Sequence, residues 1–539
     1  MRSLLIVLLG LVVQHGYCQS EFFKFFPDFE TPFKTSVFPM SDGMVWCFQN
    51  QNSTTLEIQR RTVKTDFDGE TQWIITPDSS NFSLSYACEP APGVMIFGGS
   101  YLVQDQFGPQ GWSLVTRLDA QGNVIWAKRA TSQTSAGLTG IYSNGEVIYA
   151  LYTSYSVFCG TQMYRAAVIA YDLDGNLLWE RSFGHGGFVT NYYFQAATIA
   201  DNGDLVAAID VGGSQNTQVA GIVLTRISSQ GNVSWTKHIN WQNDFTQSSV
   251  NGLAESPEGD IFLGCRLMTD QSSTYPNSLW IGKFSSDGSA LDQRIYSAGV
   301  DVGENISGMV ASENELMVYV KRYSPFETET SHIELIGINY NTLSVGSTGS
   351  TLQTSVREDV YGEDPPQLAI APDGSYFSSS IVQCAETQKS FSSMFKWTPN
   401  TFTDCNSFDV SEDYTDSVST FEVLDYVNSE GSALTHDNAE VGFTQQEIVQ
   451  ALDFCAGCDV ISSNGKMSNQ NELSFYPNPA KDFIAVSGDV ENYSIMDLQG
   501  RIVMEGQLNS AKQISMEGLS PGIFVIKLNQ EAFKLIKVN

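Results

Sequence analysis

Histidine is the side chain that most readily serves catalysis or metal binding, and in this 539-residue sequence its copies are scattered. The four that follow residue 18 are His185, His238, His332 and His436. They lie in separate parts of the chain, so no metal-binding triad is predicted. His185 stands in Gly184-His185-Gly186-Gly187, where we interpret it as a turn residue that contacts a ligand. The serine-nucleophile elbow, the His-Glu-x-x-His motif and the Walker loop do not occur, so we predict no catalytic residue, no metal and no cofactor.

Cysteine offers a second possible chemistry, because eight cysteines follow residue 18. Cys455 and Cys458 have the Cys-x-x-Cys spacing, but a redox site would need a βαβ context and a zinc site a second pair. We therefore expect a local disulfide there. We expect Cys384 and Cys405 on the second and fourth strands of the last repeat, about 9.5 Å apart and too far for a bridge. Free buried thiols are expected at Cys47, Cys88, Cys159 and Cys265.

Two short motifs alternate along the chain and indicate the elements that must position any site. The first is a polar turn with glycine, followed by a strand that ends in tryptophan. Its clear copies end at Trp73, Trp126, Trp179 and Trp235, which are 53, 53 and 56 residues apart, and worn copies follow at residues 285–292, 340–343 and 397–400. The second is a turn followed by an apolar strand, at residues 43–48, 93–97, 145–149, 203–206, 259–263, 314–318 and 374–377.

The alternation predicts repeats with two tight hairpins, hence four short strands, in about 55 residues. Seven such repeats are typical of a seven-bladed β-propeller, which we place at residues 31–412. Blade counts of six and eight stay open as alternatives, because the last three copies of the motif are degenerate. Two stacked sandwiches would not explain seven copies, and an open solenoid usually has a shorter repeat. We interpret Trp126, Trp179 and Trp235 as wedges between blades.

The turn motif Asp-x-x-Gly-Asn-x-x-Trp, present at residues 119–126 and 172–179, resembles the repeat of pyrroloquinoline-quinone-type propellers with one turn residue missing. The resemblance supports the fold and implies no cofactor. Asp172 and Asp174 stand in an Asp-x-Asp-Gly-Asn sequence that calcium can use, but no glutamate follows at the EF-hand distance. We therefore interpret both as turn residues.

Long aromatic connections between the expected strands carry the candidate ligand-binding residues. In a propeller these connections emerge on one face, and function concentrates on loops that a rigid scaffold holds. Their aromatic and polar side chains suit an extracellular glycan or a partner protein. The candidates are Tyr101, Phe107, Tyr155, Phe158, Tyr164, His185, Trp241, Tyr275 and Phe326. Two other functions stay open: a polysaccharide lyase or hydrolase, which a pair of carboxylates converging in the central channel would favour, and a structural surface protein.

Acidic residues dominate the charge of the chain, with 60 Asp and Glu against 28 Lys and Arg and a formal net charge of −32. This balance argues against nucleic acid as a partner and suits a solvated extracellular surface. Residues 397–465 hold 13 Asp and Glu and no Lys or Arg. We interpret residues 413–468 as an acidic linker with a short helix that begins at the capping box Thr444-Gln445-Gln446-Glu447.

The start of the chain is typical of a secretory signal peptide, which we place at residues 1–18. Arg2 precedes an apolar run from Leu4 to Val13, and Cys18 is small enough to precede a cleavage site at Gln19. Tyr17 is too large for a lipoprotein signal. The apolar run is too short to span a bilayer and no other stretch approaches 18 apolar residues, so no transmembrane segment is predicted.

The end of the chain contains three ordered motifs between short strand-like runs. They are Tyr476-Pro477-Asn478-Pro479, Asp497-Leu498-Gln499-Gly500-Arg501 and Leu519-Ser520-Pro521-Gly522. In this order they closely resemble the type A C-terminal sorting domain of the Bacteroidetes type IX (Por) secretion system. We place this domain at residues 469–539 as a small β-sandwich; an ordinary binding sandwich is the alternative.

The resemblance implies a route but no cargo function. It implies that an outer-membrane translocon recognises the domain, and that a sortase-like peptidase removes it while the cargo is attached to the cell surface or released. The sequence thus predicts an all-β protein, a seven-bladed propeller followed by a sorting domain, which is exported through the periplasm to the outer-membrane surface or the extracellular space.

Overall fold

The structure, a computed structural model, divides the chain into two compact units, Met1–Cys458 and Asp459–Asn539. The residues that it describes are 22–30, 32–51, 58–77, 82–105, 108–131, 135–158, 161–183, 190–213, 221–240, 247–268, 278–297, 303–323, 331–354, 368–383, 390–397, 407–408, 415–417, 422–425, 435–438, 443–446, 452–453, 474–476, 481, 483–487, 492–496, 501–508, 513–516, 518–520, 522–528 and 531–537. Regular structure in these residues is β-strand throughout, which confirms the all-β prediction.

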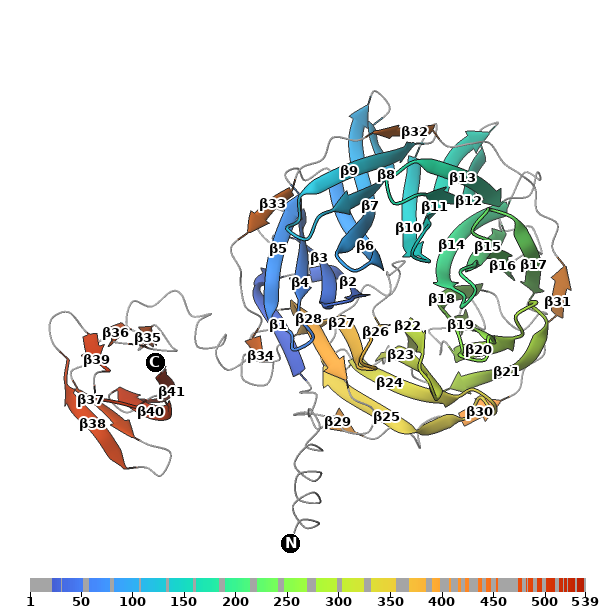
Figure 1. The fold of residues 1–539 in the computed structure, drawn as a ribbon. Coiled ribbons are helices and arrows are strands. Elements are labelled where there is room, and N and C mark those ends of the chain that lie inside the picture. Colours follow the sequence, from blue (N-terminus) through green and yellow to red (C-terminus); the bar gives the residue numbers. More distant parts are fainter. Residues whose placement is uncertain are drawn as a thin grey trace, which may run out of the picture. The chain divides into compact units, whose positions relative to one another are not determined.

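The first unit is a ring of antiparallel sheets around a central opening (Figure 1). Its described residues form seven such sheets, which we number as blades in chain order. Blades 1 to 6 each contain four consecutive strands, from the innermost to the outermost. Blades 1 to 3 comprise β2 (Pro32–Met40), β3 (Gly43–Gln51), β4 (Ile58–Thr65) and β5 (Thr71–Pro77); β6 (Phe82–Ala91), β7 (Val94–Asp105), β8 (Gly108–Leu118) and β9 (Val124–Thr131); and β10 (Ser135–Ser143), β11 (Ile148–Phe158), β12 (Thr161–Tyr171) and β13 (Leu177–Phe183).

Blades 4 to 6 repeat this pattern, which is that of a β-propeller. They comprise β14 (Thr190–Ile199), β15 (Leu205–Gly213), β16 (Gly221–Ile227) and β17 (Val233–Asn240); β18 (Gln247–Glu255), β19 (Ile261–Met268), β20 (Ser278–Phe284) and β21 (Ala290–Ser297); and β22 (Gly303–Ala311), β23 (Glu315–Tyr323), β24 (Ser331–Asn339) and β25 (Val345–Thr354).

Blade 7 closes the ring with a strand from the start of the unit. It contains β26 (Leu368–Ile370), β27 (Tyr376–Gln383) and β28 (Ser390–Trp397), and its fourth strand is β1 (Phe22–Glu30). β1 runs antiparallel to β28, with Phe23 opposite Phe395. The expected propeller start at residue 31 therefore omits one strand. The fourth strand of blade 7, on which we expected Cys405, is β1 instead, and Cys405 itself lies outside the described residues.

The acidic segment after β28 returns around the outside of the ring as a series of short strands, which we call the outer belt (Figure 1). Each belt strand pairs antiparallel with the outermost strand of a different blade, and the blades are visited in reverse order. The pairs are β29 (Ser407–Phe408) with β25, β30 (Thr415–Ser417) with β21, β31 (Glu422–Asp425) with β17, β32 (Thr435–Asn438) with β9, β33 (Phe443–Gln446) with β5, and β34 (Leu452–Asp453) with β1. In the described part of the chain, blade 3 receives no belt strand.

The outer belt corrects two expectations about residues 413–468. Five short stretches of the expected linker, β30 to β34, are added to blades as outer strands, because an outermost strand presents a row of backbone N–H and C=O groups that an extended segment can satisfy. Thr444, expected to cap a helix, lies inside β33 and opposite Thr76. Backbone pairing with the edge of blade 1 thus prevails over the local capping signal at residues 444–446, and Glu447 lies outside the described residues.

The outer hairpin turns owe their shape to an aspartate and a glycine. In blade 2, Asp119 Oδ1 accepts hydrogen bonds from the backbone N–H groups of Gln121 and Asn123, both at 2.9 Å. Gly122 adopts a φ of 85°, which favours glycine. Hydrogen bonds, chiefly from the Asn123 side chain, lower the pKa of Asp119. Asp172 makes the equivalent contacts in blade 3, so turn formation accounts for the recurrence of this aspartate in the repeat.

Tryptophan indoles link consecutive blades, as predicted. The Nε1 atom donates to a turn carbonyl of the next blade, with the pairs Trp126–Leu173 at 3.0 Å, Trp179–Ser229 at 2.8 Å and Trp235–Ser286 at 2.9 Å. Each ring also lies on the glycine of that turn. A Cβ added at Gly231, for example, would stand 2.7 Å from the Trp179 ring. Any larger residue at that position would push the two blades apart.

Basic side chains on the third strands make the same kind of contact. Arg117 Nη1 donates to Leu173 O at 3.0 Å, beside the Trp126 indole. Equivalent bonds join Lys283 Nζ to Tyr340 O at 3.1 Å and Lys396 Nζ to Phe67 O at 2.8 Å. The last of these bonds connects blade 7 to blade 1, so it supports the closure of the ring.

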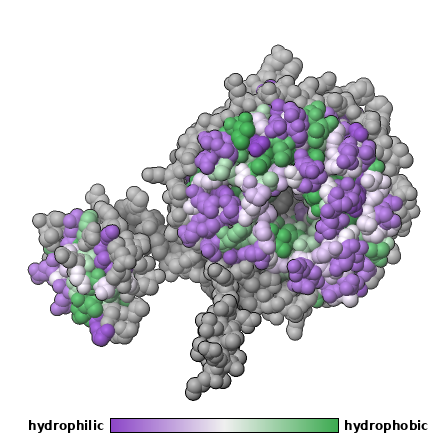
Figure 2. All heavy atoms as spheres, in the orientation of Figure 1, coloured by the Kyte–Doolittle hydropathy of each residue, from purple (hydrophilic) through white to green (hydrophobic). Residues whose placement is uncertain are grey.

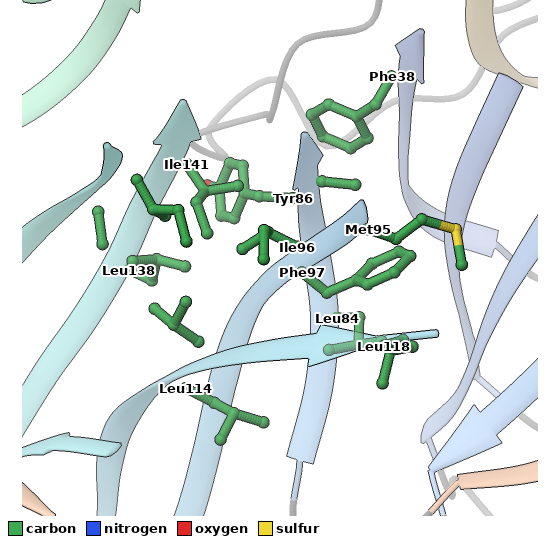
Figure 3. Packing of buried hydrophobic residues seen from close by; sticks show 14 of the residues in the cluster. Phe38, Leu84, Tyr86, Met95, Ile96, Phe97, Leu114, Leu118, Leu138 and Ile141 are labelled. Carbon is green, nitrogen blue, oxygen red and sulfur yellow. The ribbon is translucent and has the colours of Figure 1, made fainter. Parts of the chain in front are cut away.

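Apolar side chains fill the space between adjacent sheets. Figure 3 shows Leu84 and Phe97 of blade 2 in one cluster with Leu138 and Ile141 of blade 3. A Cβ added at Gly98 would stand 2.2 Å from Leu138 Cδ2, so this glycine allows the two blades to approach closely. Because each cluster draws on two or more blades, no blade has a core of its own.

The second unit is a small two-sheet β domain. One sheet contains β35 (Ser474–Tyr476), β36 (Phe483–Ser487) and β39 (Gln513–Ser515), and the other contains β37 (Asn492–Met496), β38 (Ile502–Gln507), β40 (Gly522–Leu528) and β41 (Glu531–Lys537). Ile484 and Ile514 of the first sheet share a buried cluster with Ile495, Ile526 and Leu535 of the second. Among the described residues of either unit, no helix is long and apolar enough to cross a membrane.

Removing the outer belt should destabilise the propeller. A chain that ends at residue 406 loses the belt pairing of six blades, whereas a chain that ends at residue 458 keeps it. We expect the shorter chain to unfold at least several degrees lower in a thermal scan, because each lost backbone hydrogen bond contributes roughly 0.5–1.5 kcal/mol. Equal midpoints for the two chains would show that the belt adds no stability.

Trp179→Phe should weaken the contact between blades 3 and 4. The substitution keeps an aromatic ring but removes the indole donor and leaves Ser229 O without it. We expect a loss of about 1 kcal/mol in the free energy of unfolding, measured by urea denaturation. The matched control is Trp73→Phe, because Trp73 Nε1 has no hydrogen-bond partner and its loss should cost less.

Candidate functional site

The innermost strands of all seven blades enclose a cavity of about 400 Å³. Each strand contributes the residues that precede its hairpin turn, such as residues 37–39 of β2 and 141–143 of β10. Figure 2 shows the ring hollowed at its centre. The cavity therefore lies toward the hairpin end of the channel, away from the long connections that we singled out in the sequence.

Bulges shape the wall of this cavity. In blades 2 to 6 the innermost strand carries one extra residue opposite the second strand, and the five extra residues are Ser85, Thr139, Gln195, Asn251 and Ser307. A bulge bends the strand and redirects its side chains. All five side chains are polar, and two of these residues, Gln195 and Asn251, line the cavity.

Glycines after the bulges let neighbouring inner strands approach each other. A Cβ added at Gly252 would stand 2.7 Å from Met309 Cβ, and one at Gly308 would stand 2.6 Å from Leu368 Cβ. Since real Cβ atoms do not come so close, the next blade occupies the space that a side chain would need. The width of the channel at this level is therefore set by glycine.

The described wall is mainly apolar, with a few neutral polar groups. Phe38, Ile141, Leu253 and Met309 supply much of the apolar surface. Tyr142 also lines the cavity; burial raises its pKa to about 12, against a backbone hydrogen bond from Ala197 that lowers it. The phenol is thus uncharged at neutral pH and can donate or accept a hydrogen bond.

One polar atom in the wall has no partner. Asn251 Oδ1 is buried and makes no hydrogen bond within the protein, although Asn251 lines the cavity. A buried acceptor without a donor is costly, so native structures usually satisfy such atoms.

Glu89 is the one carboxylate among the described residues of the cavity wall, and both of its carboxylate oxygens accept hydrogen bonds. Its Oε1 accepts hydrogen bonds from the Gly93 N–H at 2.7 Å and the Ser41 hydroxyl at 3.1 Å, and its Oε2 accepts one from the Ser41 N–H. Glu89 thus joins the inner hairpin of blade 1 to blade 2. Glycoside hydrolysis uses two carboxylates on opposite sides of a bond, and the described wall offers a single one with a structural role. The described residues also contain no group of three His, Cys, Asp or Glu side chains arranged to hold a metal ion.

A second acidic residue of the inner strands has the same structural role in another blade. Glu255 Oε2 accepts the Asp201 N–H of blade 4 at 2.7 Å, and its Oε1 lies 3.7 Å from Arg226 Nη1. Burial raises the pKa of Glu255, while the Asp201 hydrogen bond and Arg226 lower it. Arg226 is itself held by Asp204 Oδ2 at 2.9 Å, so this network fixes the junction between blades 4 and 5.

The described cysteines are free thiols, as expected for Cys47, Cys88 and Cys265. Cys88 lines the cavity, and burial raises its pKa well above the ordinary range. Burial likewise raises the pKa of Cys47 to about 12. The remaining cysteines considered in the sequence, Cys159, Cys384, Cys405, Cys455 and Cys458, lie outside the described residues.

Four of the predicted ligand-binding residues lie on paired strands and not on long connections, because only residues 106–107 join β7 to β8 and only residues 159–160 join β11 to β12. In backbone register, Tyr101 is opposite Trp112, Tyr155 is opposite Tyr164, and Phe158 is opposite Thr161. The Tyr164 ring lies 4.8 Å from the ring of Tyr193 in blade 4, centroid to centroid. The other five, Phe107, His185, Trp241, Tyr275 and Phe326, lie outside the described residues.

Sequence reasoning missed the cavity residues, because inner-strand positions look like ordinary strand in the sequence. The signal that was present is a polar residue before a small one, as in Gln195-Ala196, Asn251-Gly252 and Ser307-Gly308, at intervals of 56 residues.

The sorting motifs lie in and around the strands of the second unit. Tyr476 ends β35, Arg501 precedes β38 and is exposed, and Gly522 begins β40. Pro477, Asn478, Pro479, Asp497, Gly500 and Pro521 lie outside the described residues.

Cys88 should resist alkylation in the folded protein. Its raised pKa keeps it in the thiol form at pH 8, and the thiolate is the reactive species. We expect iodoacetamide to label Cys88 rapidly only in denaturant, as read from peptide mass spectrometry. Cys47, which is buried away from the cavity, is the matched control. Rapid labelling of Cys88 in the native state would contradict a protected thiol.

Residues 474–538 match the family described as "Secretion system C-terminal sorting domain". No curated protein matches the chain. Solved structures that resemble it include a protein of unknown function from Dyadobacter fermentans (11% identity, 58% of this chain and 96% of that one, TM-score 0.36). A Synechocystis apocarotenoid oxygenase variant is 10% identical, with 62% of this chain and 72% of that one covered and a TM-score of 0.34. The WD40 domain of SCAP from fission yeast is 8% identical, with 75% of this chain and 98% of that one covered and a TM-score of 0.34. None of these structural similarities bears on what this chain binds.

From the family match, the second unit carries a type IX secretion C-terminal sorting domain at residues 474–538, and this domain marks a β-propeller protein for export to the cell surface or the extracellular space.

Proposed function

We propose that the protein is an exported propeller that binds an extracellular glycan or a partner protein at the end where the long connections emerge. The observation that carries the proposal is the aromatic pair Tyr164–Tyr193, with ring centroids 4.8 Å apart. Tyr164 is the fourth residue of β12, which follows the two-residue connection 159–160, and Tyr193 is the fourth residue of β14, which follows the longer connection 184–189. Two neighbouring blades thereby present aromatic rings at one end of the ring.

Blade 2 supports the same interpretation. Trp112 lies near the start of β8, opposite Tyr101 in register, and the Arg129 guanidinium stands 4.4 Å from the centre of its ring. Blade 3 repeats the arrangement with Tyr155 opposite Tyr164. Aromatic rings with polar edges stack on sugar faces and are enriched at protein interfaces, and the sheets behind them give a rigid support.

The finer steps of export belong to the same proposal. We propose that residues 1–18 are a signal peptide of a Bacteroidetes protein, that the outer-membrane translocon recognises the sorting domain, and that a sortase-like peptidase removes it. The resemblance of the three C-terminal motifs to the type A domain supports these steps. The cargo is then either anchored at the surface or released.

Tyr164→Ala should weaken ligand binding without loss of fold. We expect saturable binding of the protein to one member of a panel of immobilised polysaccharides, with or without EDTA, and about tenfold weaker binding for Tyr164→Ala or Tyr193→Ala. Leu178→Ala is the matched control, because Leu178 is exposed near the hairpin end of the same blade.

The same wells distinguish the other functions. Released oligosaccharide would replace the proposal with a polysaccharide lyase or hydrolase. A structural surface role would remain if the protein bound no polysaccharide and if Tyr164→Ala retained a partner protein as well as the unchanged protein does. In that case the aromatic pair would bind neither class of ligand.

A further inference from the structure

We propose that the outer rim of blades 2 to 5 is a docking surface for a second copy of this chain. The rim carries an exposed apolar strip, which consists of Ile125, Leu177, Leu178, Val233 and Leu291. In the described part of the first unit, these five are all of the exposed large apolar side chains. The strip lies at the hairpin end of the outermost strands, away from the aromatic end of the propeller.

The five side chains share one position in the repeat. Each stands two or three residues after the glycine of an outer hairpin turn, at the start of β9, β13, β17 or β21. These strands follow one another along the outside of the ring (Figure 1). In blade 1 the same two positions hold Thr71 and Gln72, and Gln72 is exposed. The hairpin therefore forms with polar residues at these positions, so the fold itself does not require the apolar side chains of blades 2 to 5.

The tryptophan contacts between blades join these side chains into one strip. Trp126 follows Ile125, and its indole donates to Leu173 O in the turn that precedes Leu177. The contacts from blade 3 to blade 4 and from blade 4 to blade 5 repeat this link. The three indoles are themselves only partly buried. A partner that lies along the rim therefore meets apolar groups of four blades in succession.

The outer belt leaves the strip uncovered. Its described strands pair with later residues of the outermost strands, beginning at Lys128 in β9, Lys237 in β17 and Ile295 in β21. The apolar residues precede these positions, and their side chains are 37% to 53% exposed. Contact of aliphatic side chains with water is unfavourable, and contiguous exposed apolar patches mark interaction surfaces.

The charge along the strip identifies the partner. The chain has 60 Asp and Glu against 28 Lys and Arg, so two copies repel each other over most of their surface. The strip lies within residues 119–129, 172–182, 228–238 and 285–295, where six Asp and Glu stand against five Lys and Arg. A second copy can approach this nearly balanced surface without that repulsion.

The two signs of charge are also interspersed, which suits a surface that meets itself. Asp174 precedes the apolar pair of blade 3, and Arg181 follows it with Nε donating to Gly231 O at 2.8 Å. In a two-fold contact the same strip runs in opposite directions on the two copies, so acidic positions can face basic ones. A strongly basic partner would need an excess of acidic residues along the strip, and an anionic lipid surface would repel a chain with a net charge of −32.

The test measures the mass of the full-length protein by sedimentation velocity over a wide range of protein concentration. We expect a reversible equilibrium between monomer and dimer, because a two-fold contact closes at two copies. An increase in ionic strength from about 0.01 M to about 0.15 M shortens the Debye length from about 30 Å to about 8 Å. This change should tighten the dimer several-fold, since salt screens the repulsion between the acidic copies and preserves an apolar contact.

A double variant locates the contact. Ile125→Gln combined with Leu291→Gln should raise the dissociation constant of the dimer at least tenfold, because each copy loses two exposed apolar side chains. Both substitutions copy Gln72 of blade 1, so the strands should tolerate them, and circular dichroism checks the fold. The matched control is Ile502→Gln, which removes a similarly exposed isoleucine from the second unit and should leave the dissociation constant unchanged.

The aromatic end is tested separately, so the two proposals can fail independently. Tyr164→Ala should dimerise as the unchanged protein does. The polysaccharide assays are run below the dissociation constant of the dimer, where all variants are monomers, so that a change at the rim does not alter them.

Four results would overturn the proposal. The first is a protein that stays monomeric at every concentration. The second is a dimer whose dissociation constant does not change in the double variant. The third is a dimer that weakens as salt is added, because ion pairs would then hold it. The fourth is a monomeric protein whose strip binds phosphatidylcholine vesicles or a cationic leucine–lysine peptide, with binding lost in the double variant, because the strip would then serve another partner.

Discussion

Four of the seven blades accept a hydrogen bond from the preceding blade at the same position of an outer hairpin turn. The carbonyl group of the second residue in an outer hairpin turn accepts an indole N–H in blades 3, 4 and 5, and a lysine ammonium in blade 1. Donor and acceptor belong to different repeats, so neither is satisfied unless the neighbouring blade is in place. Because the turn glycine lies under the same aromatic ring, the contact also fixes the distance between blades.

Local chemistry explains which parts of this fold could be predicted. Aspartate and glycine at fixed offsets define a turn through hydrogen bonds within five residues, as at Asp119 and Gly122, so the hairpins and the tryptophan wedges followed from the sequence. β1 and the outer belt were not predicted. Both are added at the edge of an existing sheet, where backbone groups alone determine pairing and side chains leave a weak pattern. The capping box at Thr444 shows how such an edge can override a local helix signal.

The candidate site residues also differ in whether the sequence could predict them. Aromatic residues such as Tyr101, Tyr155 and Tyr164 stand out in the sequence because they are large, although the connections expected beside them are paired strands joined by two-residue turns. Their register beside Trp112 and one another supports the choice without testing the function. Asn251 was not singled out, because a polar residue in a strand is ordinary until the structure shows that a bulge places it at the wall of the central cavity. Long-range closure of seven inner strands creates that environment, and no local window of sequence contains it.

The belt strands pair with the blades in the order opposite to that in which the chain forms the blades. Neighbouring belted blades are therefore linked twice, once by the chain that forms them and once by the belt. Repeats held only by nearest-neighbour contacts can open one at a time. When a belted blade frays, its belt strand must detach as well, and that strand is covalently continuous with the strand on the next blade. The belt thus acts as a mechanical coupling that spreads local opening and makes unfolding more cooperative.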